Sequence, residues 1–316
     1  MAEFQNSGAL SCEKLVEAYR SKSKAKKAGE AVKLLFEGVD GRDVYNISAP
    51  FEDEGELVIA GRVERRDSEE SEIWFFVRRG ERWLPREGAP VFALQDPFYT
   101  RIGGELVFGG VQTFPHPERE GELSWRTVFY KGANLGGLSP FFQGPDQMKD
   151  LRLVELFDGS IGIFTRPQGA KGGRGKIGFA KVERLEDLSI EVVNEAPLLD
   201  QFLDEEWGGC NEIHMLANGK LGVLGHIARF DERGDRHYYP MAFGYDPVTG
   251  RYSNMEIIAE RSDFLQGPSK RQDLTDVVFS GGLVRQGGGK AKLYAGISDA
   301  EAQKLEIDDP FAEFEK

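Results

Sequence analysis

The sequence is poor in cysteine, in positive charge and in long apolar runs. Its two cysteines among 316 residues, Cys12 and Cys210, are too few for a disulfide framework or a cysteine-rich zinc site. The formal net charge of −13 disfavours nucleic acid and anionic membranes as partners. No apolar run approaches the roughly 20 residues of a membrane span, and the chain does not start with a basic segment followed by an apolar one. We therefore expect a cytoplasmic protein that binds neither nucleic acid nor membrane.

Several catalytic and cofactor motifs are also missing. The sequence has no GxSxG, HExxH, EF-hand loop or phosphate-binding P-loop, and no dinucleotide fingerprint in the required context. Glu212, His214 and His226 are a possible metal-ligand set, but a zinc site needs three or four convergent ligands. We expect neither a metal nor a cofactor.

Glycine, with 39 residues, punctuates many short apolar runs. Such runs, bounded by turn residues, are typical of β-strands. They include ELVIAGRVER, SEIWFFVRR, GGELVFGGVQTF, WRTVFYKG, LRLVELF, GSIGIFTRP, KIGFAKV, KLGVLGHIARF, HYYPMAFGYD, DVVFSGGLVR and KAKLYAGIS. No helix-length segment separates successive strands, which argues against a βαβ sheet.

Only the stretch from Ser11 to Phe36 has a helical pattern. Its basic segment, SKSKAKKAGE, is either an anion site or a solvated connection between two short helices, and we favour the connection. The predicted organisation is an N-terminal helical segment, residues 1–39, followed by a β domain, residues 40–316.

Polar residues recur at the starts of groups of strands, at intervals of 50, 54, 62 and 64 residues: Asn46, Asp96, Asp150, Glu212 and Asp276. Each interval holds three or four strand-like runs, which indicates blades of a propeller. We predict an all-β, five-bladed β-propeller, with a two-sheet sandwich as the competing architecture. The first strand of every blade faces the central channel, so these polar side chains should converge there.

Each candidate residue has a structural and a functional interpretation. Asn46 and Ser48 are groups that can hold sugar hydroxyls, or they begin a strand before Pro50. Asp96, before Pro97, is a turn cap or a functional acid. Asp276 and Asp299 are turn aspartates when taken alone.

A local positive cluster stands out in this acidic chain. Arg166 ends a strand, and its planar guanidinium can bind phosphate or carboxylate. The other members are Lys149, Asp150 and Arg152 before that hairpin, and Lys171, Arg174 and Lys176 in a glycine-rich loop. That loop is either part of an anion site or an exposed hairpin tip.

Seven motifs form a recognisable series along the chain. In order, they are NISAP, AGRVERR, QDPFYTRIGGELVFGG, KDLRLVELFDGSIGIFTRP, KLGVLGHI, DVVFSGGLV and LYAGISDAEA. The series resembles the β-mannoside phosphorylases of glycoside hydrolase family 130 and the mannosyltransferase–phosphorylases of glycosyltransferase family 108. These are five-bladed propellers. The chain departs from them at Ile47, where the family has proline, at Phe98, where it has arginine, and at Gly225–His226, where it has Tyr-His-Gly.

The resemblance implies an inverting transfer of mannose between an oligosaccharide and phosphate, with inorganic phosphate or mannose 1-phosphate as partner. It implies that Asp96 is the catalytic acid, acting on the leaving oxygen through a sugar hydroxyl. The implied phosphate-binding residues are Lys149, Arg166, His214 and His226. The implied sugar-binding residues are Asn46, Ser48, Arg62, Asp150, Glu212, Asp276 and Asp299, with Trp207 and Tyr239 as acceptor platforms.

Two other functions stay open. A hydrolase on the same scaffold would need a carboxylate, such as Glu212, near the phosphate position. A non-catalytic glycan-binding propeller would bind sugar without Asp96. A homo-oligomer is also possible, with the N-terminal helical segment packing on a neighbour.

Overall fold

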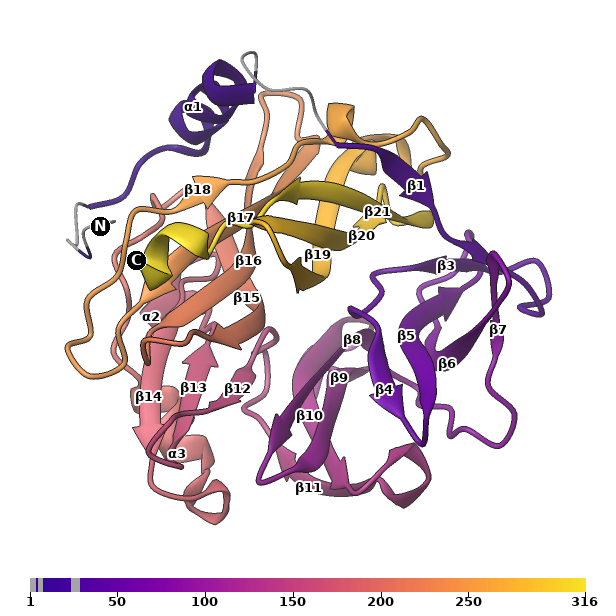
Figure 1. The fold of residues 1–316 in the computed structure, drawn as a ribbon, viewed down its shortest axis with the longest axis horizontal. Coiled ribbons are helices and arrows are strands. Elements are labelled where there is room, and N and C mark those ends of the chain that lie inside the picture. Colours follow the sequence, from indigo (N-terminus) through magenta and orange to yellow (C-terminus); the bar gives the residue numbers. More distant parts are fainter. Residues whose placement is uncertain (1–3, 5–7, 24–28) are drawn as a thin grey trace.

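The computed structural model describes Phe4, residues 8–23 and residues 29–316 of the chain. Its strands form sheets that surround a common centre, with helix α1 at the periphery (Figure 1). The predicted all-β class is therefore confirmed. The helical elements are α1 (Cys12–Ser23), α2 (Gly169–Gly172), α3 (Ile190–Glu195) and 3-10 turns at Leu135–Gly137, Leu185–Asp187, Arg261–Asp263, Gln272–Leu274 and Ala312–Glu315.

Three of the sheets are built from strands that are close in sequence. The first has the order β2-β7-β6-β5-β3, with β4 on β5, and its bounds are β2 Leu35–Phe36, β3 Asp43–Tyr45, β4 Phe51–Asp53, β5 Glu56–Glu64, β6 Ser71–Arg79 and β7 Arg82–Pro85. The second has the order β11-β10-β9-β8, with β8 Gln95–Ile102, β9 Glu105–Pro115, β10 Leu123–Gly132 and β11 Ser139–Gln143. The third has the order β12-β13-β14, with β12 Arg152–Glu155, β13 Ile161–Thr165 and β14 Gly178–Val182.

The remaining sheet joins two antiparallel groups of strands in the order β1-β21-β20-β19-β17-β16-β15, with β18 on β17. The groups meet where β17 and β19 run parallel, at the pairs His237↔Asp276 and Tyr238↔Val277. The bounds are β1 Ala31–Lys33, β15 Trp207–Met215, β16 Leu221–Phe230, β17 Arg236–Tyr245, β18 Glu256–Ile257, β19 Asp276–Gln286, β20 Lys290–Ile297 and β21 Glu301–Asp308.

Apolar clusters fill the spaces between neighbouring groups of strands. Phe98 and Phe129 of the second sheet pack with Ile163 of the third. At the other end of the chain, Phe76 of the first sheet shares a cluster with Tyr294 of β20. Both faces of the inner strands are therefore covered, which explains why β16 is buried along most of its length instead of alternating.

The residues before the first sheet correct the sequence prediction. Helix α1 forms as expected, with Glu13 in its first turn and Arg20 in its last, which complements the helix dipole. The expected second helix is wrong: β1 pairs antiparallel with β21, and β2 pairs parallel with β7. The unpaired edges of these two sheets take up the segment as strands, so this segment links the last sheet to the first. Of the basic connection, residues 24–28 lie outside the described residues.

No helix of the described residues is long and apolar enough to cross a membrane.

Candidate active site

A cavity of about 250 Å³, here called the axial cavity, collects side chains from every group of strands. Eight residues singled out from the sequence line it: Asn46, Arg62, Asp96, Lys149, Asp150, Arg166, His226 and Asp299. They are up to 253 positions apart in the chain, from Asn46 to Asp299. The expected convergence of strand-start residues therefore occurs for the first three blades of the predicted repeat.

Four of these residues have a left-handed backbone: Asn46 (φ 43°), Asp96 (φ 51°), Asp150 (φ 58°) and Asp299 (φ 50°). Asparagine and aspartate tolerate this region better than other side chains with a Cβ. Such strained conformations often occur at functional sites, where they aim a side chain. Here they turn polar groups towards the cavity at strand starts and turns that are otherwise apolar.

Asp96 is buried and has two partners on one carboxylate oxygen. Asn46 Nδ2 donates to Asp96 Oδ1 at 2.8 Å, and Arg62 Nη1 donates to the same oxygen at 3.2 Å. Asp96 Oδ2 accepts no hydrogen bond from the described residues. One oxygen of a fixed carboxylate is thus left for a ligand in the cavity.

Arg62 is held rigidly on β5. Its Nη2 donates to Glu64 Oε2 at 2.6 Å and its Nε to Ser71 Oγ at 2.9 Å, while the guanidinium lies 5.0 Å from the ring centre of Tyr45. Glu64 also pairs with Lys270. Although burial opposes ionisation, these cations hold the pKa of Glu64 below its ordinary value.

Asp299 adds a further carboxyl group to the cavity. Burial raises its pKa to about 6, with Asp96 adding to the rise and Arg62 opposing it. Asp299 therefore changes charge close to neutral pH.

A second set of lining residues carries positive charge. Arg166 is buried, its Nε donates to the carbonyl oxygen of Gly208 at 3.0 Å, and its Nη1 lies 3.3 Å from Asp150 Oδ2. Arg166 Nη1 makes no hydrogen bond among the described residues. Burial raises the pKa of Asp150, but the cations around it outweigh burial and hold it below its ordinary value. The neighbouring Lys149 has no salt bridge in the described part of the chain.

His226 completes this set as a neutral group. Burial lowers its pKa to about 3, with Asp150 opposing and Arg166 supporting the shift. Its Nδ1 lies 2.9 Å from Asn211 Oδ1, and its ring stacks on Tyr238 at 5.5 Å. Because Asn211 Oδ1 can only accept, Nδ1 of the neutral ring is the donor and Nε2 is left as an acceptor, suited to the hydroxyl of a sugar or of a protonated phosphate.

Four other sequence candidates lie outside the axial cavity. Ser48 is bonded within its own sheet, to the carbonyl oxygen of Ala49 at 2.8 Å. His214 lies 2.9 Å from Glu212, which also accepts a hydrogen bond from the Leu283 amide at 2.6 Å. Asp276 lies 2.5 Å from His237 and accepts from the Tyr239 hydroxyl at 3.2 Å. Each of these polar groups has a partner close by in the fold, and none of the four lines the axial cavity.

The expected acceptor platforms and loop cations are also engaged elsewhere. Trp207 is buried and donates to the Tyr238 hydroxyl at 3.0 Å, and Tyr239 is buried as well. Lys171 is bonded to the carbonyl oxygen of Ala196 at 2.7 Å, and Lys176 to Asp204 at 3.0 Å. Neither the platforms nor the two lysines line the cavity.

Sequence reasoning missed five polar residues that line it: Glu69, Gln95, Arg236, Tyr238 and Arg271. Glu69 belongs to the charged loop RRDSEE, and a charged loop usually indicates a solvated turn. The neighbours that bring it to the cavity are about 200 positions away, and no local pattern signals them. Among the described residues, no group of three or more His, Cys, Asp and Glu side chains is placed to hold a metal ion.

Comparison with known proteins places this site in context. Residues 20–313 match the family described as "Protein of unknown function (DUF1861)". MPT-4, a mannose phosphorylase from Leishmania mexicana solved with a phosphate ion, is 34% identical, with a TM-score of 0.88 over 96% of both chains. MPT-1, a GDP-Man-dependent mannosyltransferase from the same organism, is 34% identical, with a TM-score of 0.84 over 95% of this chain and 96% of that one.

More distant structures share the fold alone. A β-1,2-mannobiose phosphorylase from Listeria innocua is 15% identical, with a TM-score of 0.63 over 86% of this chain and 91% of that one. No curated protein matches the sequence. The resemblance that the motifs indicated is thus confirmed. Fold and relatives together define the class of this chain as an enzyme of the glycoside phosphorylase and glycosyltransferase type. The chain belongs to the DUF1861 family.

Proposed function

We propose that this protein transfers a mannosyl group between phosphate and a hydroxyl of an oligosaccharide, with inversion at the anomeric carbon. One observation carries the proposal. The axial cavity holds Asp96 with Asn46 and Arg62 on one side, and Arg166 with His226 and Lys149 on the other. A sugar and an anion can therefore bind side by side. The mannose phosphorylase and mannosyltransferase relatives support mannose as the sugar.

The two sides of the cavity have different parts in the reaction. A phosphate oxygen forms a bond to the anomeric carbon while the bond from that carbon to the departing sugar oxygen breaks. The departing oxygen receives a proton that originates on Asp96 and passes through a sugar hydroxyl. In the reverse direction, mannose 1-phosphate donates the mannosyl group, and the proton of the acceptor hydroxyl returns to Asp96. Phosphate is already an anionic nucleophile, so a second carboxylate to activate water is not needed.

The anion side is suited to phosphate in charge and geometry. Arg166 Nη1 is buried and makes no hydrogen bond among the described residues, although it lies 3.3 Å from Asp150 Oδ2, and guanidinium groups recognise phosphate through paired N–H donors. Lys149 adds a second cation and neutral His226 adds a hydrogen-bonding group. Such fixed groups stabilise the charge that develops in the transition state.

The hydrolase alternative depended on Glu212 near the phosphate position. Glu212 is instead bonded to His214 and to the Leu283 amide, outside the cavity. Asp150 is the carboxylate beside Arg166, but the surrounding cations hold its pKa below its ordinary value, which makes it a weak base for water. The phosphorylase or transferase reaction is therefore retained.

The purified protein, incubated with mannose 1-phosphate and a panel of mannose oligosaccharides, should release inorganic phosphate. Asp96→Asn should lower that rate about a thousandfold, because it removes the proton donor while retaining size and backbone preference. The same incubation with GDP-mannose, followed by GDP release, distinguishes a nucleotide donor from mannose 1-phosphate. Ser48→Ala, a buried change outside the cavity, is the control.

If the wild type releases no phosphate and Asp96→Asn binds oligosaccharide equally well, the protein is a glycan-binding propeller instead.

We further propose five blades: the first three sheets, the group β15–β18, and the group β19–β21 with β1. Apolar clusters between successive groups, including the one that joins the last group to the first, support this count. A cytoplasmic location and a homo-oligomer stay predictions.

A further inference from the structure

A second hollow of about 520 Å³ lies beside the axial cavity, between the β5–β6 loop and the segment before β19. We call it the outer hollow. Its lining is entirely polar or charged: Arg66, Asp67, Ser68, Glu69, Lys270 and Arg271. Glu69 and Arg271 line both the outer hollow and the axial cavity. These two residues therefore form a border that the two spaces share.

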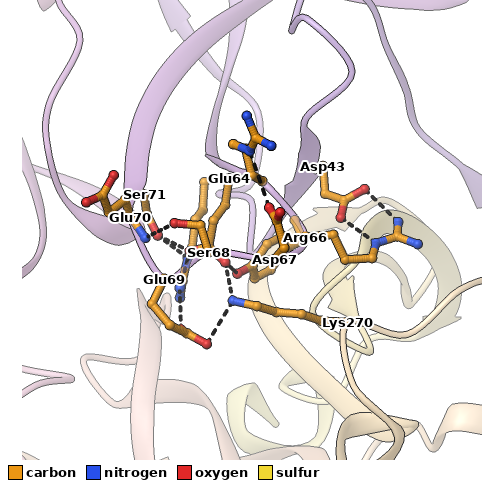
Figure 2. Close-up of polar contacts among 12 residues, drawn as sticks. Asp43, Glu64, Arg66, Asp67, Ser68, Glu69, Glu70, Ser71 and Lys270 are labelled. Atoms are coloured by element: carbon orange, nitrogen blue, oxygen red, sulfur yellow. Dashed lines mark hydrogen bonds and ion pairs between the residues drawn. The ribbon is translucent and has the colours of Figure 1, made fainter.

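The loop that carries Glu69, residues 65–70, is anchored on both sides of it. Arg66 donates twice to the Asp43 carboxylate, at 2.8 and 2.7 Å (Figure 2). On the cavity side, Gln95 Nε2 donates to the carbonyl oxygen of Glu69 at 3.4 Å. Gln95 immediately precedes Asp96, so the loop is tied to the strand that positions the proposed acid.

The carboxylate of Glu69 has its short contacts with cations through one oxygen, Oε1. Glu69 Oε1 lies 3.0 Å from Lys270 Nζ and accepts from Arg271 Nη1 at 3.0 Å (Figure 2 shows the contact with Lys270). Glu69 Oε2 lies 3.8 Å from Arg62 Nη2, beyond hydrogen-bond distance, and accepts no hydrogen bond from the described residues. An ionised carboxylate has further acceptor sites on each oxygen. Glu69 Oε2 thus offers a charged acceptor at the shared border of the two spaces, suited to a hydroxyl donor.

The position of the outer hollow fits the direction of the reaction. Inversion requires that phosphate attacks one side of the anomeric carbon while the sugar oxygen leaves from the other. The anion side consists of Arg166, which follows β13, and His226 on β16, whereas Arg62 and Glu69 come from β5 and its loop. In Figure 1, β13 lies across the centre from β5. An acceptor that leaves the cavity away from phosphate therefore moves towards the outer hollow.

We propose that the outer hollow is the acceptor subsite, and that Glu69 and Arg271 bind hydroxyl groups of the acceptor sugar at its threshold. The ligand class is a neutral mannose oligosaccharide. This inference rests on the proposed function, because the direction of departure comes from the inverting transfer. Glu69 sets acceptor binding and takes no part in proton transfer.

The test compares Glu69→Ala with Glu70→Ala, a substitution of the neighbouring exposed glutamate on the same loop, which lines neither space. Phosphate release is measured while mannose 1-phosphate and mannotriose are varied separately. Loss of a charge-assisted hydrogen bond should raise the KM for mannotriose about tenfold or more in Glu69→Ala. The KM for mannose 1-phosphate and kcat should stay within about threefold. Glu70→Ala should match the wild type.

Three outcomes distinguish failure of the acceptor subsite, failure of the proposed reaction and failure of both. If turnover occurs and the mannotriose KM of Glu69→Ala equals that of Glu70→Ala, or if donor and acceptor KM values rise together, the acceptor subsite is wrong. If nothing turns over, but mannotriose raises the unfolding temperature of wild type and Glu70→Ala and not that of Glu69→Ala, the subsite holds and the reaction is wrong. If the wild type shows no turnover and mannotriose does not raise its unfolding temperature, both the subsite and the reaction are refuted. Glu69→Gln, which retains the side-chain shape, replaces the alanine variant if that variant unfolds at assay temperature.

Discussion

At the scale of single residues, the axial cavity is built from aspartate and asparagine in strained backbone positions. Asn46 can approach its neighbours only because residue 296 is glycine: a Cβ there would stand 2.1 Å from Asn46 Oδ1. The strain and the burial of charge both cost stability, and the groups that bear them are those that would bind substrate. Stability and function therefore oppose each other at these positions.

Asp299 gives a direct measure of this opposition. Its pKa is raised to about 6, so the folded protein holds its proton more tightly than the unfolded chain does. Its contribution to stability is therefore favourable at low pH and falls as pH rises from about 4 to 6. At pH 7, Asp299→Asn should stabilise the fold by about 1–3 kcal/mol, because it removes a buried charge. The same substitution should impair mannosyl transfer.

Denaturant unfolding of both proteins at pH 4 and pH 7 tests this expectation. The difference should be present at pH 7 and nearly absent at pH 4. If Asp299→Asn raises the free energy of unfolding equally at both pH values, the increase comes from the backbone preference of asparagine and not from loss of the charge.

At the scale of elements, the short strands β1 and β2 have an effect larger than their length suggests. The Leu34 amide between them donates to the carbonyl oxygen of Ala302 at 3.0 Å, and the Glu37 amide after them donates to that of Trp83 at 3.0 Å. The segment thus hydrogen-bonds to the last sheet and the first. Closing a ring of sheets protects edges that would otherwise remain unpaired.

Leu34→Pro should lower the free energy of unfolding by about 1–3 kcal/mol, because proline has no N–H to donate to Ala302. Leu34→Ala retains that N–H and loses only side-chain contacts, so it serves as the control. Thermal unfolding followed by circular dichroism compares the two. If the two variants unfold at the same temperature, this strand pairing contributes nothing beyond the side chain.

At the scale of the whole molecule, the positive side chains of the axial cavity contrast with the negative net charge of the chain. The chain carries a net charge of −13, which repels anions at long range. The cations that line the axial cavity include Arg62, Lys149, Arg166, Arg236 and Arg271. We therefore expect an anionic donor to be bound by a few fixed cations and not by the overall field.

Inorganic phosphate should therefore stabilise the protein specifically. At a hundredfold excess over its Kd, a ligand that binds only the folded state adds about 2.7 kcal/mol, which is a rise of about 5 °C in unfolding temperature. Potassium chloride at matched ionic strength should not reproduce it. Arg166→Gln should abolish most of the rise; an unchanged rise in that variant would place the anion elsewhere.

Much of the β-architecture could be predicted because burial leaves a local mark. The run SEIWFFVRR coincides with β6, and KLGVLGHIARF contains β16. In contrast, EAQKLEID gave no strand signal, although it forms β21. β21 carries many polar residues and β1 has only three residues, so their pairing follows from the neighbouring edge and not from their own pattern.

The residues of the axial cavity could also be predicted only in part. Asn46, Asp96 and Asp150 were predictable because a repeat places equivalent residues at equivalent positions around an axis. The repeat failed at Glu212, where β15 has a bulge between Cys210 and Glu212, and a bulge re-aims side chains. The sequence by itself thus determined most of the strands, the class of fold and some of the polar residues at strand starts, since these depend on local hydrophobic periodicity. Only the tertiary structure decided which polar groups face the cavity and brought Glu69 and Arg271 to its threshold, because those contacts join residues about 200 positions apart.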